Sequence, residues 1–350
     1  MDDAQKTSGS ATPIHVKGPY SWKGSQRFII RGVVYRPHGC GPSDPLVDER
    51  LDDLQRNITL FKELGLNALF IYHVDCSRNH NGAMKLLADA GIYVLDHGVP
   101  SLLLTIAADC FATIDCVWQY TNTLGLIVAN GALSTIYSTA IAPIILNVIR
   151  DVKRYMKTAG EVVSQRQLPV GYSASTSRLI LRTTFNYFTA GKEDETVDFF
   201  CYANFNWCGQ STMQVSDYNQ EPKTFANAHV PIFFSQYGCN LSTWGHRIFQ
   251  ETTAIHSPTM TLVFSGGIAY ELYDSPDSRS GRRGHGLERL NQCKDSVVPE
   301  EMRSENLDSM EREFPPRSSH WKAMPYTMAN WIEVRWVLEE KGLAGRWRPD

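Results

Sequence analysis

The feature that most constrains the fold of this chain is the alternation of short β-rich runs with stretches of helical character. Residues 48–64 place apolar side chains at three- and four-residue spacing with charges between them, and residues 83–90 continue this pattern, which is typical of amphipathic helices. The apolar, β-branched and aromatic runs lie at residues 28–35, 68–74, 91–99, 123–130, 168–174, 197–205, 230–238 and 265–274. Strands that alternate with helices pair in parallel through right-handed crossovers, and eight such units favour a closed (β/α)8 TIM barrel over an open sheet.

The barrel is expected to occupy residues 12–275 of the 350, of which 43% are hydrophobic, enough for a core of this size. We expect residues 1–11 to be a disordered N-terminus. Residues 276–350 are predicted to form a mobile, charged tail, because their first two thirds are rich in Ser, Pro, Gly, Arg, Glu and Asp. Residues 321–347 contain four tryptophans and a helix-compatible run that could form a terminal helix.

One segment, residues 124–149, contains no formally charged side chain over 26 residues, which is long enough to cross a hydrocarbon layer of about 30 Å. Asn, Gly, Ser, Thr and Pro residues interrupt its apolar character. We therefore interpret it as a buried strand, a loop and a helix rather than a membrane-spanning helix.

Charge and cysteine usage narrow the classes of partner. A net charge of −3 does not suggest binding to nucleic acid, which leaves small molecules or neutral polymers. The eight cysteines have no metal-ligand spacing, so no metal and no cofactor are expected.

The N-terminus lacks the apolar core of a signal peptide, and the C-terminus lacks the apolar tail of a lipid-anchor signal.

In a (β/α)8 barrel, functional side chains lie at the C-terminal ends of the strands. The residues at these predicted ends are Tyr35, Tyr72, Asp96, Asn130, Gly131, Asn206, Trp207, Gln236, Tyr270 and Glu271. Only two of them, Asp96 and Glu271, are acids.

Several segments in order along the chain resemble the fungal β-1,3-glucanosyltransferases of glycoside hydrolase family 72. They lie at residues 28–35, 89–95, 120–125, 149–155, 169–173, 207–209, 233–240 and 265–270. The resemblance covers roughly residues 12–275. It implies a TIM barrel that elongates cell-wall β-1,3-glucan by retaining transglycosylation.

Retaining chemistry needs two carboxyl groups about 5–5.5 Å apart, one as nucleophile and one as acid/base. The resemblance places the acid/base at Gly131, after Asn130, and the nucleophile at Gln236, within Phe-Phe-Ser-Gln-Tyr-Gly-Cys-Asn. Glycine supplies no proton, and a neutral amide is a poor nucleophile. We therefore predict a catalytically dead pseudoenzyme with no intact catalytic residue. Two alternatives remain open: an active transglycosylase that uses relocated acids, and the product of a decayed or wrongly predicted gene.

The resemblance also implies a glucan cleft, and its candidate substrate-binding residues are Tyr35, Tyr72, Asn130, Trp207 and Tyr270. For each of these residues a purely structural role is the alternative. Other cleft positions differ from the family pattern, among them Arg36 and Phe70. The expected partner is therefore β-1,3-glucan, bound weakly by a monomer.

The cysteines follow the family pattern in part. The family's bridge between the helices after strands one and two is missing at both ends, where Leu54 and Ala83 stand. Cys208 and Cys239 remain at the ends of neighbouring strands, and we expect them to form a disulfide in an oxidising compartment. The resemblance implies a GPI-anchored protein that faces the cell wall, although neither a signal peptide nor an anchor signal is visible.

Overall fold

The computed structural model describes residues 11–37, 44–97, 106–239, 249–270 and 272. Three predicted features lie outside these described residues: the tail of residues 276–350, the candidate acid Glu271, and residues 1–10 of the predicted disordered N-terminus.

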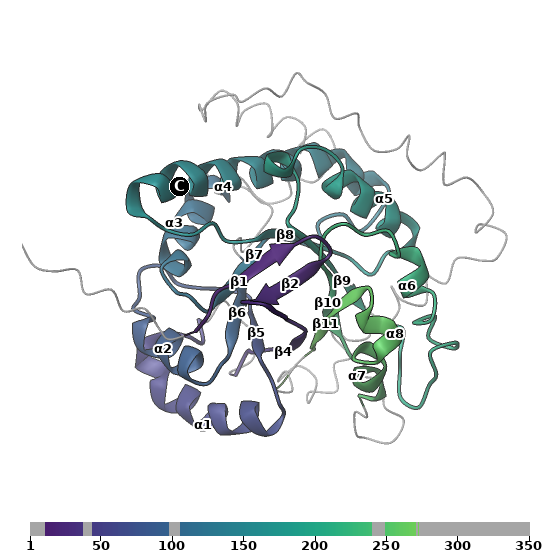
Figure 1. Ribbon diagram of the computed structural model, residues 1–350, viewed down its shortest axis with the longest axis horizontal. Helices are drawn as coiled ribbons and strands as arrows, with labels where there is room; N and C mark the ends of the chain where they lie inside the picture. The colour runs from purple at the N-terminus through teal and green to yellow at the C-terminus, as the bar shows by residue number, and fades with distance from the viewer. Residues whose placement is uncertain (1–10, 38–43, 98–105, 240–248, 271, 273–350) are drawn as a thin grey trace, which may run out of the picture.

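Eight parallel strands close into a barrel (Figure 1), which confirms the predicted fold class. Around the barrel the strands are ordered β10-β11-β4-β5-β6-β7-β8-β9, so neighbours in the chain are neighbours in space. Each lies inside one predicted run, except that β11 begins one residue earlier. Their bounds are β4 Ile30–Val34, β5 Ala68–Ile71, β6 Tyr93–Asp96, β7 Thr123–Asn130, β8 Val170–Ala174, β9 Phe199–Asn204, β10 Ile232–Tyr237 and β11 Phe264–Ala269.

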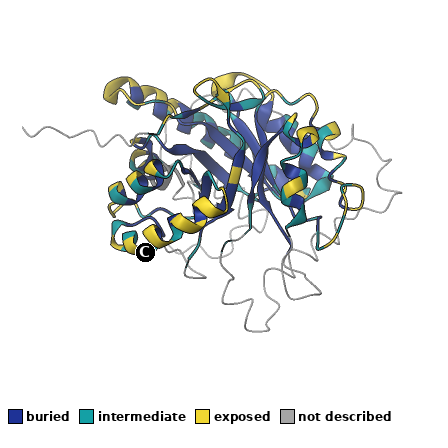
Figure 2. Cartoon of the chain, turned by 60° about the horizontal axis from the view of Figure 1, so that its bottom comes forward, coloured by how far each residue is buried: buried dark blue, intermediate teal, exposed yellow. Residues whose placement is uncertain are grey.

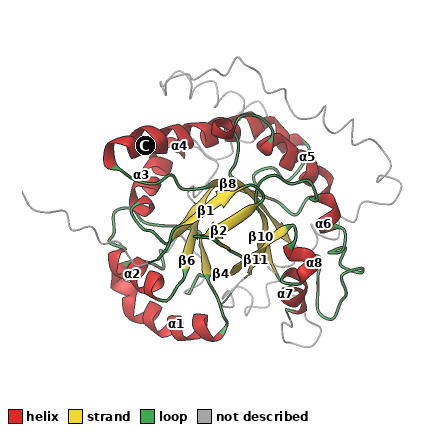
Figure 3. Ribbon diagram, in the orientation of Figure 1, coloured by secondary structure: helices red, strands yellow, loops and turns green. Residues whose placement is uncertain are grey.

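Helices surround the strands as an outer ring (Figure 3). The predicted helix at residues 48–64 is confirmed as a 3₁₀ turn, η1, followed by α1, and residues 83–90 belong largely to α2. The α-helices are α1 Leu51–Glu63, α2 Asn81–Asp89, α3 Ile106–Trp118, α4 Ala142–Val163, α5 Arg178–Thr189, α6 Glu221–Thr224, α7 Gln250–Ile255 and α8 Pro258–Thr261. The 3₁₀ helices are η1 Asp48–Arg50, η2 Tyr137–Ile141 and η3 Glu193–Glu195.

The uncharged segment of residues 124–149 forms most of β7, then η2 and the first part of α4, as predicted. Within the described part of the chain, no helix has both the length and the apolar character needed to span a bilayer.

A small antiparallel sheet precedes the barrel and was not predicted. It consists of β1 Ile14–Lys17, β2 Tyr20–Lys23 and β3 Gln26–Arg27, and Figure 1 shows β1 and β2 lying across one end of the barrel. The side chain of Arg27 donates to the carbonyl of Phe264 at 3.2 Å, and the Tyr93 hydroxyl donates to the carbonyl of Thr12 at 2.6 Å. Phe264 and Tyr93 begin their strands, so the sheet covers the N-terminal end.

The core has two layers, one on each face of the strands, whose residues are mostly buried (Figure 2). The outer layer packs the strands against the helices. The inner layer fills the barrel and includes Ile30, Phe70, Leu95, Ile127, Phe199 and Ile268. Alternation of inward and outward side chains along a strand therefore decides which residues reach the mouth, the end of the barrel at the strand C-termini.

Candidate functional site

Gln236 reaches the mouth because β10 is irregular. Phe234 belongs to the outer layer, so regular alternation would also direct Gln236 outward. The register against β9 shifts between these two residues, as in a β-bulge. The Gln236 side chain is 5% exposed, and its amide nitrogen donates to the hydroxyl of Tyr72. The position to which the resemblance assigns a nucleophile therefore does face the barrel axis.

Tyr72 lies in an aromatic group on this wall of the mouth. Its ring packs edge-on against Phe70 at 4.9 Å and His97 at 6.2 Å between centroids. The guanidinium of Arg36 lies 5.9 Å from the centre of the Tyr72 ring. Desolvation lowers the pKa of His97 to about 4, so the imidazole is neutral near pH 7. This wall presents aromatic surface with one cation beside it.

Asn130 lies in a hydroxyl-rich group on the facing strands. The hydroxyl oxygen of Ser173 lies 2.7 Å from Oδ1 of Asn130 and 2.8 Å from the hydroxyl of Ser235. Because Oδ1 of Asn130 can only accept, the single Ser173 proton is directed to it. The predicted site residue Asn130 is thereby held in place by β8 and, through Ser173, by β10.

Gly131 follows Asn130 at the end of β7, and its amide donates to the carbonyl of Ser173 at 2.8 Å. Its φ of 67° lies in the left-handed region, where an L-residue is strained. A Cβ built on Gly131 would have no heavy atom within 4 Å. A longer side chain therefore has room here, but a residue with a Cβ would be strained by the left-handed backbone at this position.

Two of the predicted substrate-binding residues lie in the outer layer rather than at the mouth. Tyr35 is 2% exposed, packs edge-on against Phe61 of α1, and accepts a hydrogen bond from Asn57 at 3.0 Å. Trp207 is 5% exposed and packs against Tyr218 at 5.4 Å. Both side chains therefore pack within the protein, and the Tyr35 hydroxyl is hydrogen-bonded to Asn57.

Tyr270 follows β11 and is half-buried beside the inner layer. Its ring packs edge-on against Phe205 at 6.1 Å. Its backbone amide donates to the carbonyl of Tyr237 at 2.8 Å. The structure thus brings Tyr72, Asn130, Gly131, Gln236 and Tyr270 to one end of the barrel.

The predicted disulfide is present and joins Cys208 to Cys239, with Cα atoms 5.0 Å apart. This agrees with the expected range for such bonds. The bond links the segments that follow β9 and β10.

Asp96 ends β6 but points away from the mouth. Tyr93 and Leu95 belong to the inner layer and Val94 to the outer one, so Asp96 continues the outward phase. It is 0% exposed, and its charged neighbours are Asp44 and His80. Burial, with the nearby Asp44 carboxylate as the second cause, raises the pKa of Asp96 to about 7.

Three mouth residues were missed by the sequence analysis: Ser173, Ser235 and His97. Their positions near the ends of predicted strands could have identified them as mouth residues.

Within the described residues, no group of three or more His, Cys, Asp or Glu side chains could hold a metal ion. At the mouth of this (β/α)8 barrel lie instead aromatic rings, amides and hydroxyl groups.

The chain belongs to glycoside hydrolase family 72, whose sequence profile, described as glucanosyltransferase, matches residues 3–281. It is 39% identical over 282 residues to 1,3-beta-glucanosyltransferase gel1 of Aspergillus fumigatus, covering 76% of this chain and 60% of gel1. It is 36% identical over 288 residues to 1,3-beta-glucanosyltransferase GAS5 of Saccharomyces cerevisiae, covering 77% of this chain and 58% of GAS5. The chain therefore spans about three-fifths of the length of these curated relatives.

The fold is similar to solved structures of Saccharomyces cerevisiae Gas2p. An apo structure of a Gas2p mutant matches with a TM-score of 0.70 and 29% identity, covering 77% of this chain and 60% of that one. Gas2p in complex with laminaripentaose matches with a TM-score of 0.70 and 27% identity, covering 82% and 69% of the two chains.

Proposed function

We propose that this chain is a β-1,3-glucan-binding barrel that has lost transglycosylation. The observation that carries the proposal is the presence of Gly131 and Gln236 at the mouth, at the ends of β7 and β10. These are the positions to which the family resemblance assigns the acid/base and the nucleophile.

Neither residue can perform the retaining reaction. Without a general acid the glycosidic oxygen leaves unassisted, which costs on the order of 10²–10⁴ in rate. The amide of Gln236 carries no charge to form a glycosyl ester or to stabilise an oxocarbenium-like transition state. The amide nitrogen of Gln236 also donates a hydrogen bond to the Tyr72 hydroxyl, whereas the reaction needs an electron-rich oxygen at this position.

Two buried acids near strand ends, Asp96 and Glu221, have their contacts outside the barrel interior. Asp96 lies close enough to Asp44 and His80 for their charges to shift its pKa. Glu221 is 0% exposed and accepts hydrogen bonds from Tyr202 at 2.6 Å and Asn204 at 3.0 Å. This disfavours a relocated catalytic pair that includes Asp96.

Glucan binding is supported by the groups that the mouth retains. Tyr72 and Tyr270 offer aromatic faces to sugar rings, and Asn130 offers an amide to hydroxyl groups. The fold neighbour Gas2p has been solved with laminaripentaose. Sugar hydroxyls left without partners cost about 1–3 kcal/mol each, so we expect dissociation constants of about millimolar or weaker.

The test is to incubate the purified protein with a long β-1,3-glucan oligosaccharide, with gel1 as a positive control. We expect neither longer transfer products nor shorter hydrolysis products. Transfer products from the unmodified chain would overturn the loss of catalysis and favour an enzyme that uses other acids.

Binding is measured separately, by chemical-shift titration with the same oligosaccharide. Tyr72→Ala should weaken binding at least fivefold, whereas Trp22→Ala, in the sheet at the opposite end of the barrel, is the matched control. Equal effects of the two substitutions, or no saturable binding, would refute a glucan site at the mouth.

A further inference from the structure

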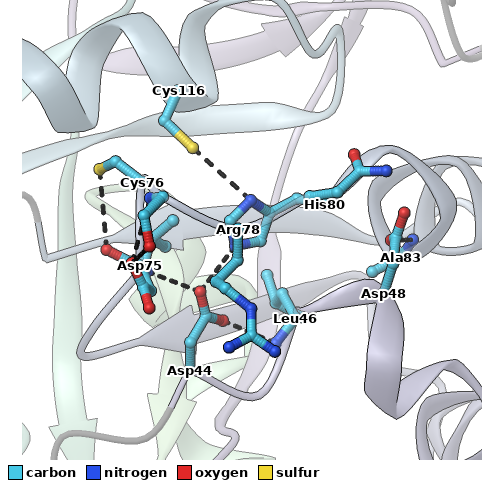
Figure 4. A network of polar contacts seen from close by, with 12 residues as sticks. Asp44, Leu46, Asp48, Asp75, Cys76, Arg78, His80, Ala83 and Cys116 are labelled. Atoms are coloured by element: carbon cyan, nitrogen blue, oxygen red, sulfur yellow. Dashed lines mark hydrogen bonds and ion pairs between the residues drawn. The ribbon is translucent and has the colours of Figure 1, made fainter.

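A second polar cluster is formed by the loops that follow β4 and β5 together with α3 (Figure 4). At its centre is Asp44, whose carboxylate accepts the backbone amides of Leu46 and Asp75, each at 2.7 Å. The same carboxylate lies 2.6 Å from Nε2 of His80. Asp44 and His80 are 3% and 2% exposed, so this pair is fixed in orientation.

The contact with Asp44 decides which imidazole nitrogen is free to accept a proton. A carboxylate accepts, so Nε2 of a neutral His80 carries the hydrogen and Nδ1 carries a lone pair. Nδ1 lies 3.6 Å from the sulfur of Cys116, which is half-buried on α3. His80 is therefore positioned as a base for the Cys116 thiol, with Asp44 behind it.

A second thiol, Cys76, reaches the same helix from the loop between β5 and α2. Cys76 is exposed, and its sulfur lies 3.7 Å from the hydroxyl of Thr113. Thr113 lies three positions before Cys116, hence on the same helical face one turn away. Burial raises the pKa of Cys116 to about 12, and the neighbouring Cys76 thiol, which also hydrogen-bonds to it, adds to the rise. The two sulfur atoms are therefore neighbours, one accessible and one protected.

We propose that Cys76 and Cys116 form a reversible disulfide by exchange with a small-molecule disulfide such as oxidised glutathione. The Cys76 thiolate, having lost its proton to solvent, attacks the glutathione disulfide and releases one glutathione thiolate. Cys116 then transfers its proton to Nδ1 of His80, attacks the sulfur of Cys76 and releases the second glutathione. Two protein thiols are oxidised to one disulfide, and one glutathione disulfide is reduced to two thiols.

The two cysteines differ in solvent exposure, and this difference sets the order in which they react. Cys76 is the exposed thiol and reacts first, whereas Cys116 resolves the mixed disulfide from within the protein. The bond would tie the loop after β5 to α3. Tyr72 lies at the start of that loop, so the bond would act on a segment adjoining the mouth.

The experiment uses the full chain with Cys40, Cys110 and Cys293 replaced by Ser, treated with oxidised glutathione and mapped by mass spectrometry. We expect a cross-link between the Cys76 and Cys116 peptides, reversed by dithiothreitol. Cys116→Ser should retain glutathione on Cys76, whereas Cys76→Ser should leave Cys116 unmodified. Cys201, which is buried, is the internal unreactive control.

The contribution of His80 is tested with His80→Gln, whose amide can keep the contact with Asp44 but offers no base to Cys116. We expect the glutathione adduct on Cys76 to persist at least tenfold longer than in the parent chain. An adduct on Cys76 that never resolves while Cys116 is present, or modification of Cys116 in Cys76→Ser, would overturn the proposal. Both of these outcomes can be read even if His80→Gln does not fold.

Discussion

Replacing Asp96 with Asn should stabilise the protein, and the gain should grow as the pH rises. Burial, with Asp44 as the second cause, raises the pKa of Asp96 from 3.8 to about 7. A folded state that binds the proton more tightly than the unfolded chain loses stability as the pH rises between these two values. The shift corresponds to about 4 kcal/mol at full ionisation, at 1.36 kcal/mol for each pKa unit. Asn cannot ionise and avoids this loss.

The assay is urea unfolding of the parent chain and of Asp96→Asn at pH 4.5, 6 and 8. We expect the difference in free energy of unfolding to favour Asn increasingly between pH 4.5 and 8, with about 4 kcal/mol as the upper limit of the change. Asp89→Asn is the control, because Asp89 is an exposed residue paired with Lys85 on α2. A difference between parent and Asp96→Asn that does not vary with pH would refute the reasoning. Since Asp96 faces away from the mouth, its replacement should leave glucan affinity unchanged.

Three further predictions concern the mouth, the disulfide and the barrel interior. Gly131→Glu combined with Gln236→Glu should restore at best a trace of transfer activity. The left-handed backbone at position 131 misplaces the acid, and small misplacements of a catalytic group cost about 10²-fold in rate. Activity within tenfold of gel1 in the product assay would contradict this prediction. Cys208→Ser should lower the free energy of unfolding by about 2–4 kcal/mol, measured in urea without reductant, because the bond closes a loop between residues 31 positions apart; an unchanged value under oxidising conditions would contradict it. Gly171→Ala should lower the free energy of unfolding by about 1–3 kcal/mol, because its Cβ would lie 2.1 Å from the ring of Phe199. Adding Phe199→Leu to this variant should recover part of the loss in the same urea assay. No recovery would show that the ring is not the cause.

The barrel could be predicted because buried parallel strands are continuous apolar runs, which stand out between amphipathic helices. The small sheet at the N-terminal end was missed because its strands are short and only partly buried. Its signal was present in the glycines of its two turns, Gly18 and Gly24, which both adopt a φ of 58°. A short hairpin is therefore predicted better from its turn residues than from the alternation of apolar side chains along its strands.

The candidate site could be predicted only as far as the strand ends. The sequence indicates that Tyr35, Asp96 and Gln236 lie near the C-terminal ends of strands, but not on which side of the barrel wall. A shift of one residue reverses the direction of a side chain, and the irregular register of β10 could not be anticipated. Asp44 and His80 are 36 positions apart, in two loops separated by α1 and β5, so no local sequence pattern predicts their contact.

The hydrogen bond between Gln236 and Tyr72 bears on the stability of a barrel that has no carboxylate at position 131 or 236. Two carboxylates held about 5–5.5 Å apart in a partly desolvated mouth repel one another, and active sites carry this cost for the sake of the reaction. An amide at position 236 has no charge to desolvate and donates to the Tyr72 hydroxyl, while glycine at position 131 adopts its left-handed backbone without strain. Both residues therefore favour the folded state more than two carboxylates at these positions would. An intact, stable barrel is therefore expected whether or not the chain transfers glucan, and only the product assay distinguishes the two cases.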